Sequence, residues 1–428
     1  MRRILIYMSI QQHGEYDVFS RPNDRAFAEN IKSSCHGVCP NTGNRLWFQG
    51  IISAIWNPDV TMEYFSYSMS KEYINQNFDF IVAPMANIVS VGYIALLETL
   101  AERFRGIKIP VYVIACGIQA SGYDQLAEIV GVLKGPASRF ISRVYDTGGE
   151  FALRGFFTKE FFDKLGFPSA VVTGCPSLYQ LGRELSIDYT LAPREAFRPL
   201  FNGSAGNYVH LLKQCPTAVF MDQDVYWREL LDPDFGDNRP SEKDCLRSLI
   251  NRYGFDVTKY LLEGRIQLIP NANLWREFIR KEQFSLSYGS RIHGNIMPLL
   301  AGIPAILEYR DARTLEMAEF FKMPYSIATP RSADALYDLY GSVDYTEFNR
   351  GFAKKYDAYE QFLQKCGIVD QINTRNPFFY DLNCASVQSI NCETHATLFT
   401  KMEQEKVHWK TYSQVLSVKR KIVSALTK

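Results

Sequence analysis

Short apolar runs alternate with amphipathic stretches along most of this chain, and this pattern predicts its elements. Mostly apolar runs bounded by turn residues predict strands, and apolar positions that recur at helical spacing predict helices. In the first half, strands are predicted at 4–8, 79–84, 110–117, 140–144 and 170–176. Helices are predicted at 46–56, 88–104, 124–133 and 150–165. Strands that alternate with helices and end at glycines are typical of a parallel, Rossmann-like sheet.

The alternation stops over residues 186–206, where Pro193, Pro199 and the pair Asn202-Gly203 predict an irregular linker. It resumes with strands predicted at 218–221, 266–269, 284–288 and 305–308 and helices predicted at 241–253, 274–281, 296–301 and 314–321. Beyond residue 345 the pattern is largely helical.

The chain of 428 residues is too long for one ordinary core and suits two domains. We therefore expect an α/β protein in which two Rossmann-like domains face a cleft. The expected boundaries are 1–185 for the N-terminal domain, 186–206 for the linker, 207–345 for the C-terminal domain and 346–428 for a mainly helical extension.

Composition narrows the class of protein. Hydrophobic residues make up 46 % of the chain and charged residues 22 %, which is ordinary for a globular protein. The net charge of +1 argues against an electrostatic nucleic-acid binder. No apolar run approaches the ~18 residues of a membrane span, and the apolar run at the N-terminus is too short for a signal peptide. We therefore expect a cytoplasmic protein.

Nine cysteines are scattered along the chain, which favours reduced thiols over a disulfide framework. Cys35, His36 and Cys39 lie close together but lack a second ligand pair at structural-zinc spacing, so we expect no metal site. The segment 401–428 is basic and carries an apolar stripe. It predicts a terminal helix that packs on its own protein or one that lies on the inner surface of an anionic membrane.

The segment 284–295 holds the clearest candidate chemistry. An apolar run ends at Gly289-Ser290, and Arg291 and His293 follow at the start of a predicted helix. A strand that turns into a helix aims free N–H groups and the positive end of the helix dipole at one point, where an anion can bind. Arg291 can hold a carboxylate or phosphate with two hydrogen bonds, and His293 can bind the same ligand or transfer a proton. The alternative is local pairing and capping within the helix start.

Four segments share their residues with a known family. Asn41-Thr42-Gly43-Asn44 resembles an Asn-x-Gly-Asp loop, and 153–158 resembles an Arg-Gly-x-x-Thr helix start. The segment 172–177 resembles the end of a first domain, and 289–304 resembles a Ser-x-Arg-x-His motif. The chain is thus similar to polysaccharide pyruvyl transferases over roughly residues 1–325. Asn44 departs from the family's usual Asp, which argues against a role there that needs a carboxylate.

The resemblance implies a glycosyltransferase-B-like architecture and a transferase activity. The enolpyruvyl group of phosphoenolpyruvate would move to a sugar hydroxyl and leave a pyruvate ketal. The acceptor would be an exopolysaccharide or capsule of the cell envelope, or its lipid-linked precursor. The resemblance also implies that Arg291 and His293 face the donor and carry out the catalysis.

Phosphoenolpyruvate carries a carboxylate and a phosphate, so its site needs at least two cationic or N–H-rich anchors. Gly289, Ser290, Arg291 and His293 are expected to supply one anchor, and Arg310 or Arg313 a further charge. His293 is expected either to protonate C3 of the donor or to bind the leaving phosphate. We expect no cofactor besides this donor substrate, because fixed dipoles and arginines can neutralise its charge.

The implied architecture assigns the donor to the second domain, so the acceptor is expected against the first. Asn41, Asn44 and Arg154 are the acceptor candidates because each stands at a predicted loop-to-helix start. The alternatives are that the two asparagines only shape and cap the turn, and that Arg154 pairs with Glu150.

Two other functions remain open. A nucleotide-sugar glycosyltransferase would use the same architecture, and Glu308, at a predicted strand end, would then hold a ribose. A non-catalytic protein would bind donor or glycan and release no phosphate. Turnover with phosphoenolpyruvate, compared with turnover with sugar nucleotides, separates these functions.

Overall fold

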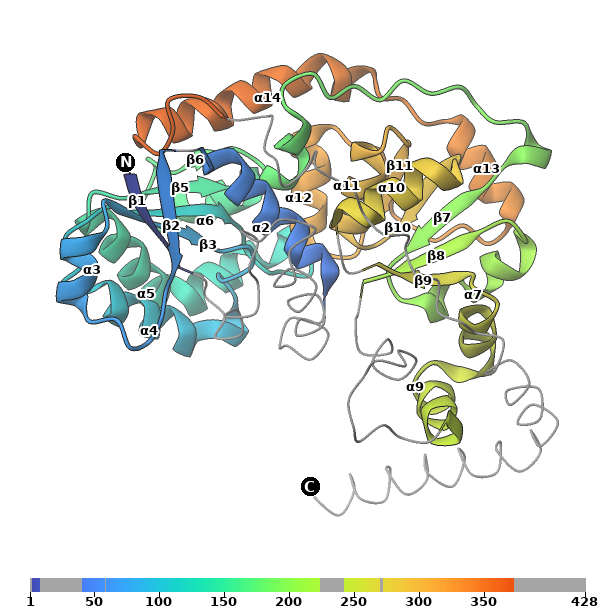
Figure 1. Cartoon of the computed structure of the whole chain (residues 1–428), viewed down its shortest axis with the longest axis horizontal. Helices are drawn as coiled ribbons and strands as arrows, with labels where there is room; N and C mark the ends of the chain where they lie inside the picture. The colour runs from blue at the N-terminus through green and yellow to red at the C-terminus, as the bar shows by residue number, and fades with distance from the viewer. Residues whose placement is uncertain (1, 8–40, 58, 224–241, 270–271, 373–428) are drawn as a thin grey trace.

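The computed structural model describes residues 2–7, 41–57, 59–223, 242–269 and 272–372. These residues form two α/β domains, each built on a six-stranded parallel sheet (Figure 1). The expected fold class is confirmed: two Rossmann-like domains face each other in a glycosyltransferase-B-like arrangement, and a long helix follows the second. Within the described ranges, no helix has the length and apolar character needed to cross a membrane.

The first sheet has the strand order β2-β1-β3-β4-β5-β6. Its strands are β1 (Arg2–Ile6), β2 (Val60–Tyr64), β3 (Phe80–Pro84), β4 (Val111–Cys116), β5 (Glu150–Leu153) and β6 (Val171–Val172). One face is covered by α2 (Thr42–Ile55) and η3 (Pro176–Leu181). The other face is covered by α3 (Lys71–Asn77), α4 (Ile94–Phe104), α5 (Leu126–Asp146) and α6 (Phe156–Lys164), and the short helices η1 (Val91–Tyr93) and η2 (Tyr123–Gln125) precede α4 and α5.

The second sheet has the order β9-β8-β7-β10-β11-β12. Its strands are β7 (Pro199–Asn202), β8 (Val219–Asp222), β9 (Ile266–Leu268), β10 (Leu286–Gly289), β11 (Ala305–Glu308) and β12 (Tyr325–Ser326). Its helices are α7 (Ala205–Gln214), α9 (Glu242–Leu262), α10 (Ala272–Glu282), α11 (Ile292–Leu300), α12 (Ala312–Phe321) and α13 (Ala333–Gly341), and η4 (Arg194–Ala196) precedes β7. This order is that of a doubly wound dinucleotide-binding sheet, whose direction of winding reverses between β7 and β10.

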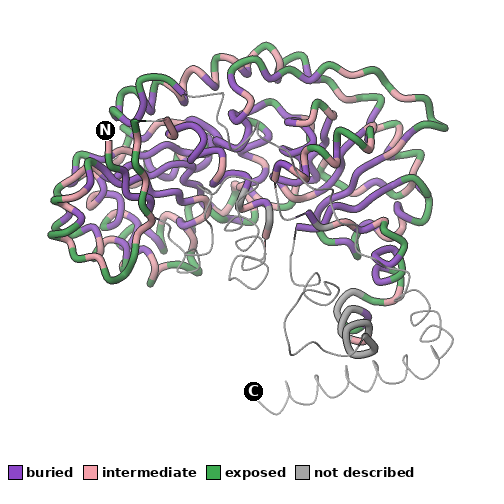
Figure 2. Tube along the Cα trace, in the orientation of Figure 1, coloured by how far each residue is buried: buried purple, intermediate pink, exposed green. Residues whose placement is uncertain are grey.

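Side chains alternate between the two faces of each strand, as a pleated strand requires. Ile4 and Ile6 of β1 belong to one apolar cluster, and Leu5 between them belongs to another. Buried residues follow the strands of both sheets (Figure 2). The cluster that contains Ile4 continues into the second domain through Ile296 of α11 and Phe321 of α12, so the two domains share a core at their boundary.

The helix α14 (Thr346–Lys365) ties the second domain back to the first. The hydroxyl of Tyr345, just before α14, donates to the carbonyl of Ala305 at 2.6 Å. Near its other end, Lys365 pairs with Glu150 of the first sheet at 3.1 Å. Figure 1 shows α14 running from the second domain back over the first. The two domains are therefore connected both by the irregular segment before β7 and by this helix.

Two expected elements in the first domain are wrong. The strand expected at 140–144 is the last part of α5, because Phe140, Ile141 and Val144 belong to the helical set of residues that α5 buries against the sheet. The helix expected at 150–165 begins later, because Glu150–Leu153 is the strand β5. The buried run of β5 has no polar alternation, so its pattern alone does not separate it from a buried helix.

Besides the short 3-10 helices, six elements were not predicted: β2, α3, β7, α7, β12 and α13. The strand β7 and the start of α7 lie within the segment 186–206 that was expected to be irregular, so that expectation is wrong from residue 199 onward. Proline is tolerated at the first residue of a strand, which is the position of Pro199. The edge strand β2 was also not predicted, because it is short and alternates with exposed residues. The segments 35–39 and 401–428 lie outside the described residues.

Candidate active site

The corner after β10 lies at the point where the second sheet reverses its winding. Asn202 ends β7, the neighbouring strand, and its Oδ1 accepts a hydrogen bond from the backbone N–H of Arg291 at 3.0 Å. Its Nδ2 donates to Oδ1 of Asn295 at 3.0 Å, and Asn295 in turn donates to the carbonyl of Gly289 at 2.8 Å. Asn202 and Asn295 are fully buried. This network fixes the backbone from which Arg291 and His293 project.

Gly289 is required at this corner. A Cβ at residue 289 would lie 1.9 Å from the carbonyl oxygen of Asn202, which is far inside van der Waals contact. The close approach allows β7 and β10 to meet at their carboxyl ends, where open α/β sheets bind ligands. Ser290 follows and is half-buried beside Gly203.

His293 is buried between the two domains. Its imidazole Nε2 lies 3.8 Å from the thiol Sγ of Cys175, which belongs to the first domain. Burial lowers the pKa of His293 well below its usual value, and the charges of Arg154, Arg313 and Arg291 lower it further. The imidazole is therefore neutral in the free protein at neutral pH, and three guanidinium groups lie close enough to act on it.

Arg154 brings the first domain into the site. It follows β5 directly, and only 2 % of its surface is exposed. Nη1 donates to Oδ1 of Asn87 at 3.2 Å, whereas Nε and Nη2 contact no hydrogen-bond acceptor among the residues that the structure describes. Burial lowers the pKa of Arg154, and the charge of Arg313 lowers it further. The expected alternative, a pair with Glu150, is wrong because the Glu150 carboxylate binds Lys365.

Two further buried N–H groups near His293 also lack an acceptor within the described part of the chain. Nε of Arg313 has none, although Nη2 of the same side chain pairs with Asp311 at 3.0 Å. Nε2 of Gln223, after β8, has none either, and it would lie 2.5 Å from a Cβ at Gly294. Buried donors are almost always paired in folded proteins. Unpaired donors from both domains around one imidazole therefore point to an anionic ligand.

Glu316 connects the two domains beside these arginines. It lies on α12, and its carboxylate accepts from the N–H of Thr158 at 3.0 Å and from the hydroxyl of Thr158 at 2.9 Å. Burial raises the pKa of Glu316 to about 7, although these two hydrogen bonds and the charge of Arg154 oppose the shift. Arg154 and Thr158 are the first and last residues of the Arg-Gly-x-x-Thr segment, so both of its polar ends face the domain boundary.

Glu308 and Arg310 pair with each other, and Glu308 also binds side chains of its own domain. The Glu308 carboxylate accepts from the hydroxyls of Tyr208 and Thr329, each at 2.6 Å, and pairs with Arg310 at 2.5 Å. Its side chain is only 2 % exposed. The carboxylate is thus already held by three donors of its own domain. Donor binding by Arg310 stays a prediction.

Asn41 is the N-cap of α2, and its Oδ1 accepts from the N–H of Gly43 at 2.8 Å. The capping role therefore exists, and acceptor contact by Asn41 or Asn44 stays a prediction. The start of α2 reaches the site, because a Cβ at Gly43 would lie 2.4 Å from Oε1 of Gln223 and 2.9 Å from Cβ of His293. Gly43 thus allows the two domains to meet at this point.

The sequence did not single out Asn202, Gln223, Cys175 or Glu316 as site residues. Asn202 was assigned to the linker, and Gln223 follows a strand without any motif. Only Cys175 lay in a segment that was compared with the family. For Glu316 one signal existed, because a buried acidic residue on a predicted helix needs a partner.

The fold and the site define a class of protein: a two-domain, glycosyltransferase-B-like α/β protein with a cationic site at the boundary between its sheets. A family model described as polysaccharide pyruvyl transferase matches residues 41–311. The chain therefore belongs to the polysaccharide pyruvyl transferase family and is a transferase of that class. No curated protein matches the chain in sequence.

Several solved structures are similar to the chain. A putative UDP-N-acetylglucosamine 2-epimerase from Listeria monocytogenes is 11 % identical, with a TM-score of 0.38, and the match covers 87 % of this chain and 99 % of that one. The UDP-GlcNAc 2-epimerase of Neisseria meningitidis is 10 % identical, with a TM-score of 0.34 and coverage of 94 % and 100 %. A glycosyltransferase from Streptomyces nogalater is 12 % identical, with a TM-score of 0.32 and coverage of 88 % and 98 %.

Proposed function

We propose that this protein transfers the three carbons of phosphoenolpyruvate to two hydroxyls of a sugar, forming a pyruvate ketal and releasing phosphate. The observation that carries the proposal is the set of buried N–H donors without acceptors on Arg154, Arg313 and Gln223. Arg291 and the start of α11 lie at the same corner. Phosphoenolpyruvate has two anionic groups and would pair these donors from both domains at once.

The reaction needs a proton donor to C3 and an acceptor for the proton of each attacking hydroxyl. The first sugar hydroxyl attacks C2 of the donor and passes its proton to an oxygen of the donor phosphate, while C3 gains a proton and becomes a methyl group. A second hydroxyl then displaces phosphate from C2 and loses its own proton. His293 can give the proton to C3 and afterwards accept one from the second hydroxyl, so the imidazole returns to its starting state.

The surroundings of His293 suit this cycle only when the donor is bound. In the free protein, burial and three arginines keep the imidazole neutral. A bound donor with about three negative charges would offset these arginines and raise the pKa of His293. The proton would therefore be taken up together with the donor, which restricts acid catalysis to the loaded site.

The membership in the family supports transfer to a sugar or polysaccharide acceptor. For the acceptor side, Asn41 and Asn44 remain candidates at the start of α2. We reassign Arg154 to the donor because its charge acts directly on His293 and Arg313.

The test is transfer of label from phosphoenolpyruvate that carries ¹³C at C2. The protein is incubated with the labelled donor and a panel of glycosides that have free neighbouring or 4,6-hydroxyls, and phosphate release is followed. The proposal expects phosphate release together with a ¹³C ketal signal in the glycoside. Release of nucleoside diphosphate from sugar nucleotides, without use of phosphoenolpyruvate, would instead support a nucleotide-sugar glycosyltransferase. Binding without any release would support a non-catalytic protein.

A further inference from the structure

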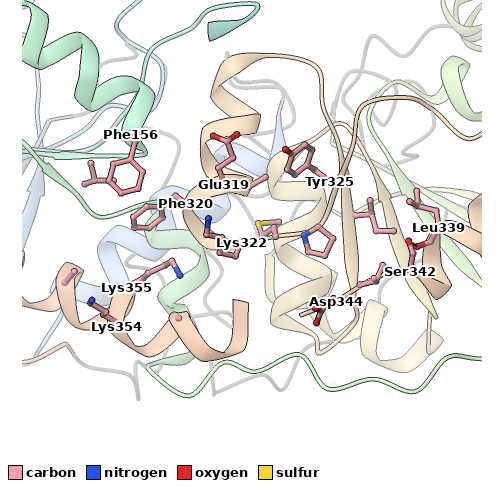
Figure 3. Close-up of a pocket in the computed structure, with 18 residues that line it drawn as sticks. Phe156, Glu319, Phe320, Lys322, Tyr325, Leu339, Ser342, Asp344, Lys354 and Lys355 are labelled. Carbon is pink, nitrogen blue, oxygen red and sulfur yellow. Dashed lines mark hydrogen bonds between the residues drawn. The ribbon is translucent and has the colours of Figure 1, made fainter. Parts of the chain in front are cut away.

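A pocket of about 980 Å³ lies on the α14 side of the domain boundary (Figure 3). Its walls come from both domains: Phe156 starts α6 of the first domain, and Phe320 and Lys322 end α12 of the second. Lys354 and Lys355 of α14 complete its basic side. None of these residues belongs to the site around His293.

Three lysines line this pocket, of which Lys322 and Lys354 are exposed. Among the described residues, no carboxylate lies within ion-pair distance of Lys322, Lys354 or Lys355. Lys355 is half-buried, with its ammonium 6.0 Å from the centre of the Phe320 ring. Burial lowers the pKa of Lys355, and the charges of Lys322 and Lys354 lower it further, against an opposing effect of Glu347. Like charges that are held together in a partly buried site are stabilised by an anion.

The two carboxylates in the pocket wall are already engaged. Glu319 accepts a hydrogen bond from the hydroxyl of Tyr123 at 2.7 Å. Asp344 accepts one from the N–H of Thr346 at 2.8 Å, and hydrogen bonding by the side chain and the N–H of Thr346 lowers the pKa of Asp344. Neither of these two carboxylates forms an ion pair with the three lysines. The charge of Glu347 also acts on Lys322 and Lys355, but Glu347 forms its ion pair with Arg350.

The backbone also directs two of the lysines. Lys322 caps α12 in a left-handed conformation with φ of 61°, a position where glycine or asparagine is usual. Ordinary residues held in this region cost free energy and cluster at functional sites. The ammonium of Lys355 lies against Gly351, because a Cβ at that residue would be only 2.5 Å from Nζ.

Aromatic rings line the same pocket. The Phe156 side chain is 66 % exposed, although it packs against Phe320 with ring centres 5.9 Å apart and ring planes inclined at 56°. Tyr325 is 44 % exposed. Figure 3 shows the Phe156 and Phe320 rings together, with Lys322 and Lys355 next to them. The face of an aromatic ring is the negative side of its quadrupole and suits the C–H face of a sugar ring. Aromatic faces beside ammonium groups thus match a sugar that carries an anionic group.

The pocket and the candidate active site share two elements. Phe156 stands two residues after Arg154, and Phe320 stands four residues after Glu316 on α12. Four residues of helix correspond to about 6 Å along its axis. The pocket therefore begins about one turn of α12 away from Glu316, which lies beside Arg154.

We propose that this pocket binds the anionic part of the acceptor, an oligosaccharide with carboxylate or phosphate groups, through Lys322, Lys354, Lys355 and the ring of Phe156. The identity of the ligand as acceptor rests on the function proposed above. The anionic groups can belong to acidic sugars of the polymer or to the pyrophosphate of a lipid-linked precursor, and both have the same chemistry at the lysines.

The test is binding by calorimetry with the full chain in the absence of phosphoenolpyruvate. The anionic probes are a hyaluronan tetrasaccharide, which carries carboxylates, and farnesyl pyrophosphoryl N-acetylglucosamine, which represents the lipid-linked source. Neutral chitotetraose is the uncharged control. The variants are Lys354→Gln with Lys355→Gln, and Phe156→Ala. Lys365→Gln is the matched control because Lys365 lies on the same helix and pairs with Glu150 away from the pocket.

We expect at least one anionic probe to bind wild type more tightly than chitotetraose. Its affinity should fall about tenfold or more in the double lysine variant and in Phe156→Ala, and stay unchanged in Lys365→Gln. The probe that binds identifies the source of the charge. Equal affinity in the double variant, equal affinity for chitotetraose, or no binding of either anionic probe overturns the proposal. Failure of the proposed function would appear separately, as no phosphate release from phosphoenolpyruvate by a protein that still binds the anionic probe.

Discussion

Arg291 projects from a backbone position that Asn202 and the end of β10 fix. A guanidinium can hold a carboxylate or phosphate with two parallel hydrogen bonds, and an ammonium cannot. We expect Arg291→Lys to lose most of the turnover with phosphoenolpyruvate while the thermal unfolding midpoint stays near that of wild type. Steady-state phosphate release measures the loss. Arg280→Lys is the matched comparison within the same domain, because Arg280 is exposed on α10 and pairs with Glu277. Near wild-type activity of Arg291→Lys would remove Arg291 from the donor site.

His293 is expected to gain a proton when the donor binds. Calorimetry of phosphoenolpyruvate binding in buffers of different ionisation enthalpy should show net proton uptake near neutral pH, and His293→Ala should abolish it. The same variant should lower kcat by about 10²–10⁴-fold, as expected for loss of acid–base catalysis. His210→Ala is the control, since His210 only contacts the carbonyl of Pro330. Equal proton uptake in His293→Ala would assign the titration to another group.

Asn202 connects β7 and β10 where the winding of the second sheet reverses, so replacing it should lower the stability of the protein. Replacement by Ala removes the acceptor of the Arg291 N–H and one of the two hydrogen bonds that Oδ1 of Asn295 accepts, both in a buried place. We expect a loss of about 1–3 kcal/mol in the free energy of unfolding by urea. Asn207→Ala, at an exposed position on α7, should change it little. Similar values for the two variants would show that the network contributes nothing.

At the level of elements, α12 and α6 meet through the contact of Glu316 with Thr158. The pKa of Glu316 is raised to about 7, above its usual 4.5, so the folded protein holds this proton more tightly than the unfolded chain. Stability from this source is complete at low pH and is lost as the pH rises through about 7. Glu316→Gln keeps an acceptor for Thr158 but does not titrate. We expect its unfolding midpoint, relative to wild type, to rise between pH 5 and pH 8, and a constant difference would contradict this assignment.

The sequence predicts strongly periodic elements well and short buried ones poorly. The runs of β3, β4 and β11 were placed within a residue of their observed bounds, because each is apolar and bounded by turn residues. The end of α5 and the strand β5 were exchanged in type, since buried helix and buried strand are equally apolar there. β7 was not predicted because its flanking prolines and Asn202-Gly203 are usual in loops, although the strand pairs on both sides.

The sequence predicted only the part of the site that has a local pattern. The corner with Arg291 and His293 has a local pattern, a strand followed by a helix, that the sequence alone reveals. The contributions of Arg154, Gln223 and Cys175 depend on where the first domain lies against the second, and no local pattern encodes that contact.

At the level of the whole molecule, the account's central claim is that both domains hold the donor. Arg154 comes from the first domain, and its buried Nε and Nη2 have no acceptor in the described ranges of the chain. A buried charge without full pairing is unfavourable, so Arg154 should cost stability in the absence of ligand and bind tightly in its presence.

The most direct test is the thermal unfolding of Arg154→Met and wild type with and without phosphoenolpyruvate. We expect the free variant to unfold at the same temperature as wild type or higher, because methionine fills the space without a charge. Phosphoenolpyruvate should raise the midpoint of wild type and raise that of the variant much less. An equal rise in both proteins would show that Arg154 does not touch the donor, and would contradict a site built from both domains.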